Sequence, residues 1–96
     1  MSNLMIFQNF LREEQLFSKY NLSKVGLFGS FARNDKNAQD IDILIDNENI
    51  EPDKLIELKT IIEKSFGKKV DMVLEKYANP IILYRAKKDL KYATQY

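Results

Sequence analysis

The fold is decided by residues 28–42, Phe-Gly-Ser-Phe-Ala-Arg-Asn-Asp-Lys-Asn-Ala-Gln-Asp-Ile-Asp. A short apolar run ends in Gly29-Ser30, a polar loop follows, and carboxylates then alternate with isoleucines from residue 40 to residue 46. Successive side chains of a strand point to opposite faces, so Asp40 and Asp42 share one face, about 7 Å apart along the backbone. Two neighbouring anions repel each other unless a cation lies between them. The stretch therefore predicts a cation-binding strand beside a Gly-Ser turn that suits phosphate.

Length and composition narrow the class of protein. The chain has 96 residues, which is enough for a single domain spanning residues 1–96. It has no cysteine and no histidine, so disulfides, thiolate sites and imidazole catalysis are excluded. A metal ion would then need oxygen ligands, as magnesium does. A net charge of +1 argues against strong direct binding to nucleic acid. No apolar run approaches the length of a membrane span, and we expect a cytoplasmic protein.

Hydrophobic periodicity predicts an α/β (α+β) fold. We expect helices over residues 3–20, 51–67 and 79–95, strands over residues 24–28, 40–46 and 68–74, and turns at residues 21–23 and 47–49. These elements make a small, mixed, three-stranded sheet with the helices packed on its isoleucine face. The aspartate face would be left open for a ligand.

The last predicted helix carries a second stripe besides its core face. Tyrosines and a lysine recur four residues apart at Tyr84, Lys88, Tyr92 and Tyr96. Either these side chains flank the core with their polar ends in water, or they form a surface for a partner protein, since tyrosine is favoured at interfaces.

A third aspartate adds to the predicted site. Asp71 lies on a separate strand, on the face away from the apolar side chains. Three carboxylates on one face suit two magnesium ions that orient a nucleoside triphosphate, and Asp71 alternatively accepts a proton from an attacking hydroxyl. Gly29 allows phosphate to approach the backbone, and Ser30 offers a hydroxyl and an amide. Arg33 and Lys36 are candidates for further phosphate contacts.

The combination of these residues resembles a known family. Gly29-Ser30, Asp40-x-Asp42 and Asp71, with flanks at residues 27–33 and 43–45, are similar to the minimal nucleotidyltransferases of the DNA polymerase β-like superfamily. The resemblance implies that Gly29 and Ser30 hold the triphosphate. It also implies that Asp40, Asp42 and Asp71 form the catalytic, magnesium-binding triad of carboxylates. The loop before the first aspartate is one residue shorter than usual, and Asn34 stands where glycine is common; asparagine tolerates left-handed backbone better than most residues.

The resemblance also implies an activity. Free minimal members of the family are similar to antitoxins that act on HEPN-domain RNase toxins. They move AMP from ATP to a toxin tyrosine hydroxyl, in an assembly with that toxin. Two alternatives remain at this point: an antitoxin that masks the toxin without catalysis, and a nucleotidyltransferase acting on a small molecule or an RNA end.

Overall fold

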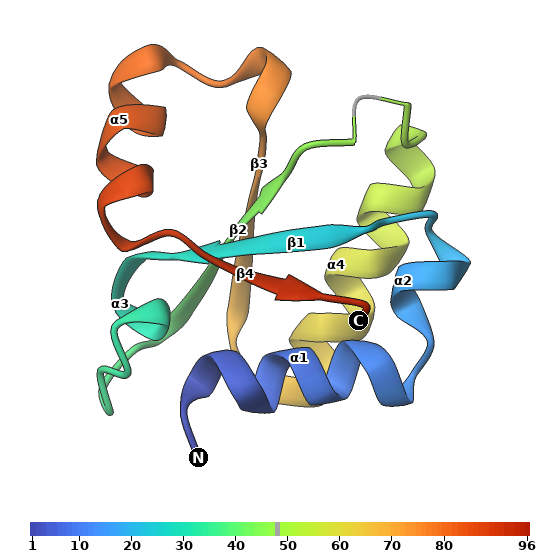
Figure 1. Ribbon diagram of the computed structural model, residues 1–96, viewed down its shortest axis with the longest axis horizontal. Helices are drawn as coiled ribbons and strands as arrows, with labels where there is room; N and C mark the ends of the chain where they lie inside the picture. Colours follow the sequence, from blue (N-terminus) through green and yellow to red (C-terminus); the bar gives the residue numbers. More distant parts are fainter. Residues whose placement is uncertain (48) are drawn as a thin grey trace.

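The protein is built around a twisted, four-stranded mixed sheet in the order β3-β2-β1-β4 (Figure 1). The computed structural model describes residues 1–47 and 49–96. The strands are β1 (Lys24–Phe28), β2 (Asp40–Ile45), β3 (Lys69–Leu74) and β4 (Lys91–Thr94). β1 is antiparallel to both β2 and β4, whereas β2 and β3 are parallel. The mixed sheet is confirmed, but it has four strands instead of the expected three.

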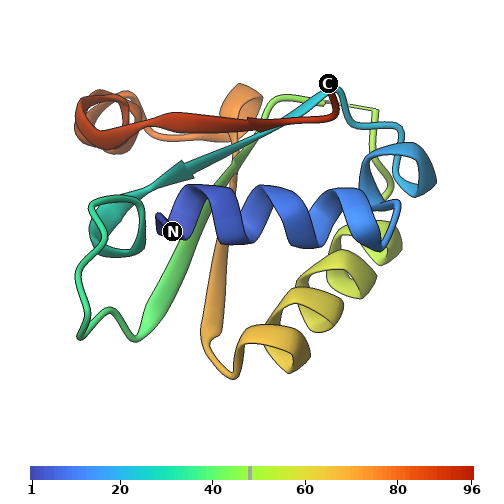
Figure 2. The same ribbon diagram turned by 60° about the horizontal axis from the view of Figure 1, so that its bottom comes forward.

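The isoleucine face of the sheet carries the main core, as predicted. Helices α1 (Asn3–Glu13) and α4 (Pro52–Phe66) lie together on this side (Figure 2). Ile41 and Ile43 of β2 are completely buried there. The same cluster contains buried side chains from both helices, namely Phe7, Leu11, Leu58 and Ile62. The alternation of β2 therefore separates a packed face from a face that carries the aspartates.

Helix boundaries follow local chemistry. The Ser2 hydroxyl accepts a hydrogen bond from the Met5 amide at 3.2 Å, which caps α1. Pro52 occupies the first turn of α4, and Gly67 ends it with a φ of 63°. The single helix expected over residues 3–20 is wrong, because Gln15 adopts a φ of 56° and separates α1 from the short helix α2 (Leu16–Lys19). Between β1 and β2 lies one further turn of helix, α3 (Gly29–Ala32). The turn expected at residues 47–49 includes Glu48, which lies outside the described residues.

The C-terminal prediction needs the largest correction. After the 3-10 turn η1 (Glu75–Tyr77), helix α5 spans only Pro80–Asp89, and the chain then continues as β4. Pairing with β1 supplies β4 with backbone hydrogen bonds and buries Ala93 completely, so tertiary contacts override the helical spacing. The tyrosine stripe consequently does not exist as one helix face, because Tyr84 lies on α5 and Tyr92 on β4.

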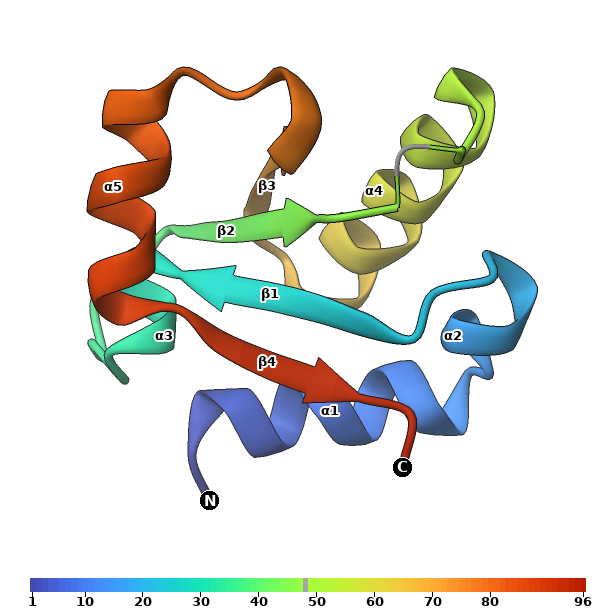
Figure 3. The ribbon, with the colours of Figure 1, turned by 45° about the horizontal axis from the view of Figure 1, so that its top comes forward.

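The aspartate face is not fully open either. Helix α5 crosses one end of the sheet, beside the end of β1 and the start of β2 (Figure 3). A small second core forms beneath it, where Leu44 and Ala86 are buried. A Cβ on Gly26 would meet the Leu90 side chain at 2.8 Å, which shows how tightly the chain after α5 packs on β1. Helix α5 therefore covers part of the aspartate face that we expected to be open for a ligand.

The outer edge of β4 is covered by side chains of α1. The Thr94 amide donates a 2.9 Å hydrogen bond to the Gln8 side chain, and its carbonyl accepts one of 2.9 Å from Arg12. In the described part of the chain, none of the helices is both long enough and apolar enough to cross a membrane.

Candidate functional site

The structure brings the three predicted aspartates to one place on the sheet. Asp42 of β2 lies directly opposite Asp71 of β3 in the parallel register, and Asp40 is two residues earlier on the same face. Burial raises the pKa of Asp42 above its ordinary value, and the negative charges of Asp71 and Asp40 raise it further, while Arg33 acts in the opposite direction. The carboxylates are therefore close enough to repel one another. Asp71 is also 3.9 Å from the Lys69 ammonium.

Gly29 sits against this cluster, where β1 passes into α3. Its φ is 74°, a conformation that side chains with a Cβ rarely adopt. A Cβ at this position would also collide with the Asp42 carboxylate. Glycine is thus required here by the neighbouring carboxylate as well as by the backbone. Ser30 follows in the first turn of α3, and Asn34 has a left-handed backbone with a φ of 63°, which asparagine tolerates better than most residues.

A pocket of about 270 Å³ opens beside Gly29 and Asp42, with α5 as its other wall. Its lining comes from β1, α3, β2 and α5: Phe28, Gly29, Arg33, Asp42, Ile82, Arg85, Ala86 and Asp89. Arg33 therefore lies at the site, as predicted, but its guanidinium forms a 2.6 Å ion pair with Asp89. The pocket contains both positive and negative groups, which suits a metal-bound polyphosphate better than a simple anion.

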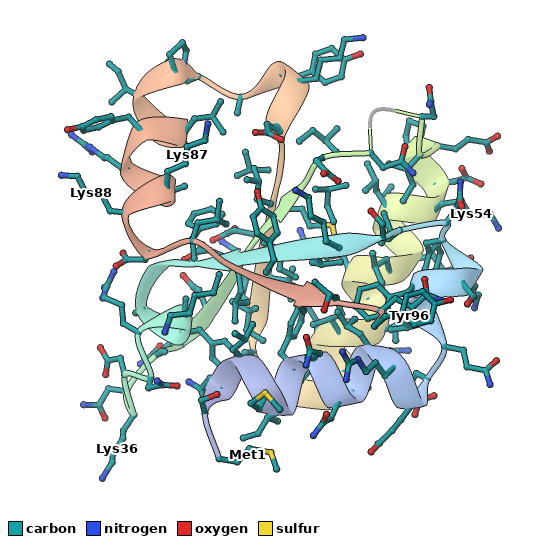
Figure 4. All side chains as sticks on the ribbon, in the orientation of Figure 1. Met1, Lys36, Lys54, Lys87, Lys88 and Tyr96 are labelled. Carbon is teal, nitrogen blue, oxygen red and sulfur yellow. The ribbon has the colours of Figure 1, made fainter. Side chains whose placement is uncertain are left out.

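One predicted phosphate contact is not at the pocket, and two residues that line the pocket were not predicted. Lys36 lies in the loop between α3 and β2 and points away from the rest of the molecule, so it is not part of the pocket (Figure 4). Arg85 and Asp89 line the pocket but were missed by the sequence analysis. The helical spacing of Ile82, Arg85 and Asp89 indicates that they share one face of a helix. It does not indicate that this face contacts the aspartate side of the sheet.

The turn that contains Gly29 is tied to the last strand. The Lys91 ammonium donates a 3.0 Å hydrogen bond to the Ala32 carbonyl at the end of α3. The ring of Phe31, also in α3, packs against Phe66 with ring centroids 6.1 Å apart. α3 is therefore held from two sides, by the core and by β4, and its position beside Asp42 is fixed by tertiary contacts.

Comparisons with known proteins identify the family of this chain. The polymerase beta nucleotidyltransferase family matches residues 13–92. A putative protein adenylyltransferase of Methanocaldococcus jannaschii is 37% identical over 97 residues, covering 96% of this chain and 99% of that protein. The protein adenylyltransferase MntA of Thermococcus cleftensis is 36% identical over 66 residues, covering 66% of each chain.

A solved structure shows the same fold. It is described as a toxin-antitoxin crystal structure with AMP-PNP, and it aligns with a TM-score of 0.69 at 20% identity. The match covers 90% of this chain and 71% of that one. The chain belongs to the polymerase beta nucleotidyltransferase family. Within that family it has the nucleotidyltransferase fold, and it is a nucleotidyltransferase enzyme.

Proposed function

We propose that this chain is an antitoxin-type protein adenylyltransferase. It transfers AMP from ATP to a hydroxyl, a tyrosine in our proposal, of a cognate HEPN RNase toxin, and it depends on magnesium. The observation that carries the proposal is the placement of Asp42 opposite Asp71, with the Gly29 backbone against the Asp42 carboxylate. Such an arrangement gathers anions whose mutual repulsion a bound cation would relieve.

The relatives support the choice of reaction and acceptor. The similar proteins include protein adenylyltransferases, and the similar solved structure is a toxin-antitoxin with AMP-PNP. In our proposal the acceptor is a separate toxin protein, and the reaction takes place in the cytoplasm, where ATP is available.

Magnesium fits the donor set. Asp40, Asp42 and Asp71 offer only carboxylate oxygens, which this ion prefers. Across residues 1–47 and 49–96, no three acidic side chains form a ready-made metal cage. Magnesium usually keeps several waters and takes further oxygen ligands from substrate phosphates, so it does not need a complete cage of side chains. When bound, the ion would neutralise charge on the phosphates; Asp40 and Asp42 would hold it, with Asp71 completing the set.

The chain's own residues account for the remaining steps. Gly29 and Ser30 would cradle the triphosphate, and Arg33 would contact it from the end of α3. The acceptor hydroxyl oxygen bonds to the α-phosphorus while the bond from that phosphorus to the bridging oxygen of the β-phosphate breaks. Pyrophosphate leaves, and the hydroxyl proton passes to the Asp71 carboxylate, which is about half exposed and so accessible to an incoming protein.

A labelling experiment tests the proposal. The protein is incubated with ATP labelled at the α-phosphate, magnesium and the product of the neighbouring gene, and the double variant Asp40→Ala/Asp42→Ala is run in parallel. We expect label on a tyrosine of the partner with the wild-type protein and none with the variant. A variant that still neutralises the partner fully would show that masking is sufficient. Label on an added RNA end or small molecule, with none on the partner, would contradict the proposed acceptor.

A further inference from the structure

Arg85 of α5 lies on the wall of the pocket that faces Gly29 and Asp42. Ile82, Arg85, Ala86 and Asp89 all line this pocket, and their spacing puts them along one side of the helix. Lys88, one turn away from Tyr84, extends from the outer side of α5, away from the sheet (Figure 4). The helix therefore presents Arg85 to the pocket, whereas Lys88 lies on its outer side.

The two arginines of the pocket differ in their partners. Arg33 is paired with Asp89 at 2.6 Å, so its charge is already balanced by a carboxylate. Arg85 is exposed, and within the described residues it has neither an ion pair nor a hydrogen bond. Asp42 and Asp89 supply two negative charges to the lining, and Arg33 and Arg85 supply two positive ones. Of the two arginines in the lining, Arg85 is thus the one whose charge is not paired with a carboxylate in the described residues.

We infer that Arg85 binds the polyphosphate of the nucleotide. The inference rests on the proposed function, because it takes the ligand to be a nucleoside triphosphate. The planar guanidinium presents a fork of donors that matches two phosphate oxygens, and an arginine without an internal partner loses no bond on making this contact. Arg33, held by Asp89, borders the pocket from α3, and Arg85 borders it from α5, so the phosphates would lie between two helices.

Binding of ATP and of inorganic pyrophosphate, both with magnesium, tests the inference by titration calorimetry. Arg85→Gln should weaken both ligands about tenfold, the size expected for one charge-assisted contact. Arg85→Lys should recover part of the affinity, since it keeps the charge and loses the fork. Lys88→Gln is the matched control, because it removes the same charge from the outer side of the same helix and should leave both affinities unchanged.

The outcomes separate this inference from the proposed function. If Arg85→Gln left the affinity for pyrophosphate unchanged, the inference would be overturned. If Lys88→Gln lost as much affinity as Arg85→Gln, the inference would also be overturned, because the effect would then come from the net charge of the protein. Loss of ATP affinity without loss of pyrophosphate affinity would assign Arg85 to the nucleoside and overturn the inference. Arg85-dependent binding of pyrophosphate by a protein that labels no partner would leave the inference standing and remove the proposed adenylylation.

Discussion

The backbone of Gly29 lies so close to the Asp42 carboxylate that a Cβ at residue 29 would collide with it. The turn that precedes α3 and the strand that carries the aspartates are therefore fitted to each other. We expect Gly29→Ala to move one of them and to lower the rate of AMP transfer about 100-fold, as displacement of reacting groups by about 1 Å does. The left-handed φ should add about 1–2 kcal/mol of destabilisation.

Gly67→Ala is the matched control for that variant. Gly67 has a similar φ of 63°, but a Cβ there would meet nothing within 4 Å. It should cost about 1 kcal/mol of unfolding free energy and leave the transfer rate unchanged. Equal rates for the two variants would show that the contact with Asp42 has no role in the site.

Asp71→Asn should lower activity without lowering the stability of the fold. The substitution removes a carboxylate that faces Asp42, so repulsion in the folded state decreases. We expect AMP transfer to fall by about 10²–10⁴-fold, the usual contribution of a proton acceptor. The unfolding free energy in urea should stay the same or rise by up to about 1 kcal/mol. Asp46→Asn, which changes an exposed carboxylate just beyond β2, should retain activity; a strongly destabilised Asp71→Asn would argue for a structural role.

The Tyr20–Glu57 pair should make stability depend on pH at both ends of the range. The Tyr20 hydroxyl donates a 2.6 Å hydrogen bond to Glu57. Burial, and then this bond and the charge of Glu57, raise the pKa of Tyr20 from 10.0 to about 12. The unfolded chain therefore loses its proton first as the pH rises, and stability should fall between pH 10 and about 12.

The same hydrogen bond lowers the pKa of Glu57 below its ordinary 4.5. The stability that it contributes is complete above pH 4.5 and is lost as the pH falls through the lower folded-state value. Urea unfolding at a series of pH values should show that Tyr20→Phe flattens both limbs. Tyr96→Phe is the control, because Tyr96 is 97% exposed. Identical pH profiles for wild type and Tyr20→Phe would contradict the role of the pair.

Phe66 should contribute both to the stability of the core and to the position of α3 at the site. Its ring contacts three others, with centroid distances of 6.0 Å to Phe7, 5.2 Å to Phe10 and 6.1 Å to Phe31. Phe66→Ala should lower the unfolding free energy by about 3 kcal/mol. Because Phe31 belongs to α3, the variant should also weaken ATP binding at temperatures where it remains folded. Phe66→Leu should recover most of the stability; full ATP affinity in a destabilised Phe66→Ala would show that α3 keeps its position without this contact.

Local patterns in the sequence predicted much of the fold and of the site. The alternation of residues 40–43 specifies which face of β2 carries the main core, and it therefore places Asp40 and Asp42 together on the other face. The turn that ends the helix over residues 52–66 at Gly67 was likewise indicated by a local signal, a glycine after the last apolar side chain. These features depend on neighbours in the chain, which is why sequence reasoning reached them.

The features that sequence reasoning missed depend on contacts between distant segments. Ala86, Leu90 and Ala93 have helical spacing, yet Ala93 belongs to a strand because β1 offers it a pairing edge. The end of α5 at Asp89 places that carboxylate beside Arg33, 56 residues earlier in the chain. No local pattern specifies that α5 covers the aspartate face, so Arg85 and Asp89 could be found only in the structure.

The covering of Thr94 by Gln8 and Arg12 has a consequence for self-association. An exposed edge strand offers free amides and carbonyls that recruit strands from other molecules, and this is a common route to aggregates. Here the side chains of α1 already occupy both backbone groups of Thr94. Growth of the sheet past β4 would first have to break these two hydrogen bonds, so fibril-like stacking at that edge is disfavoured while α1 stays in place.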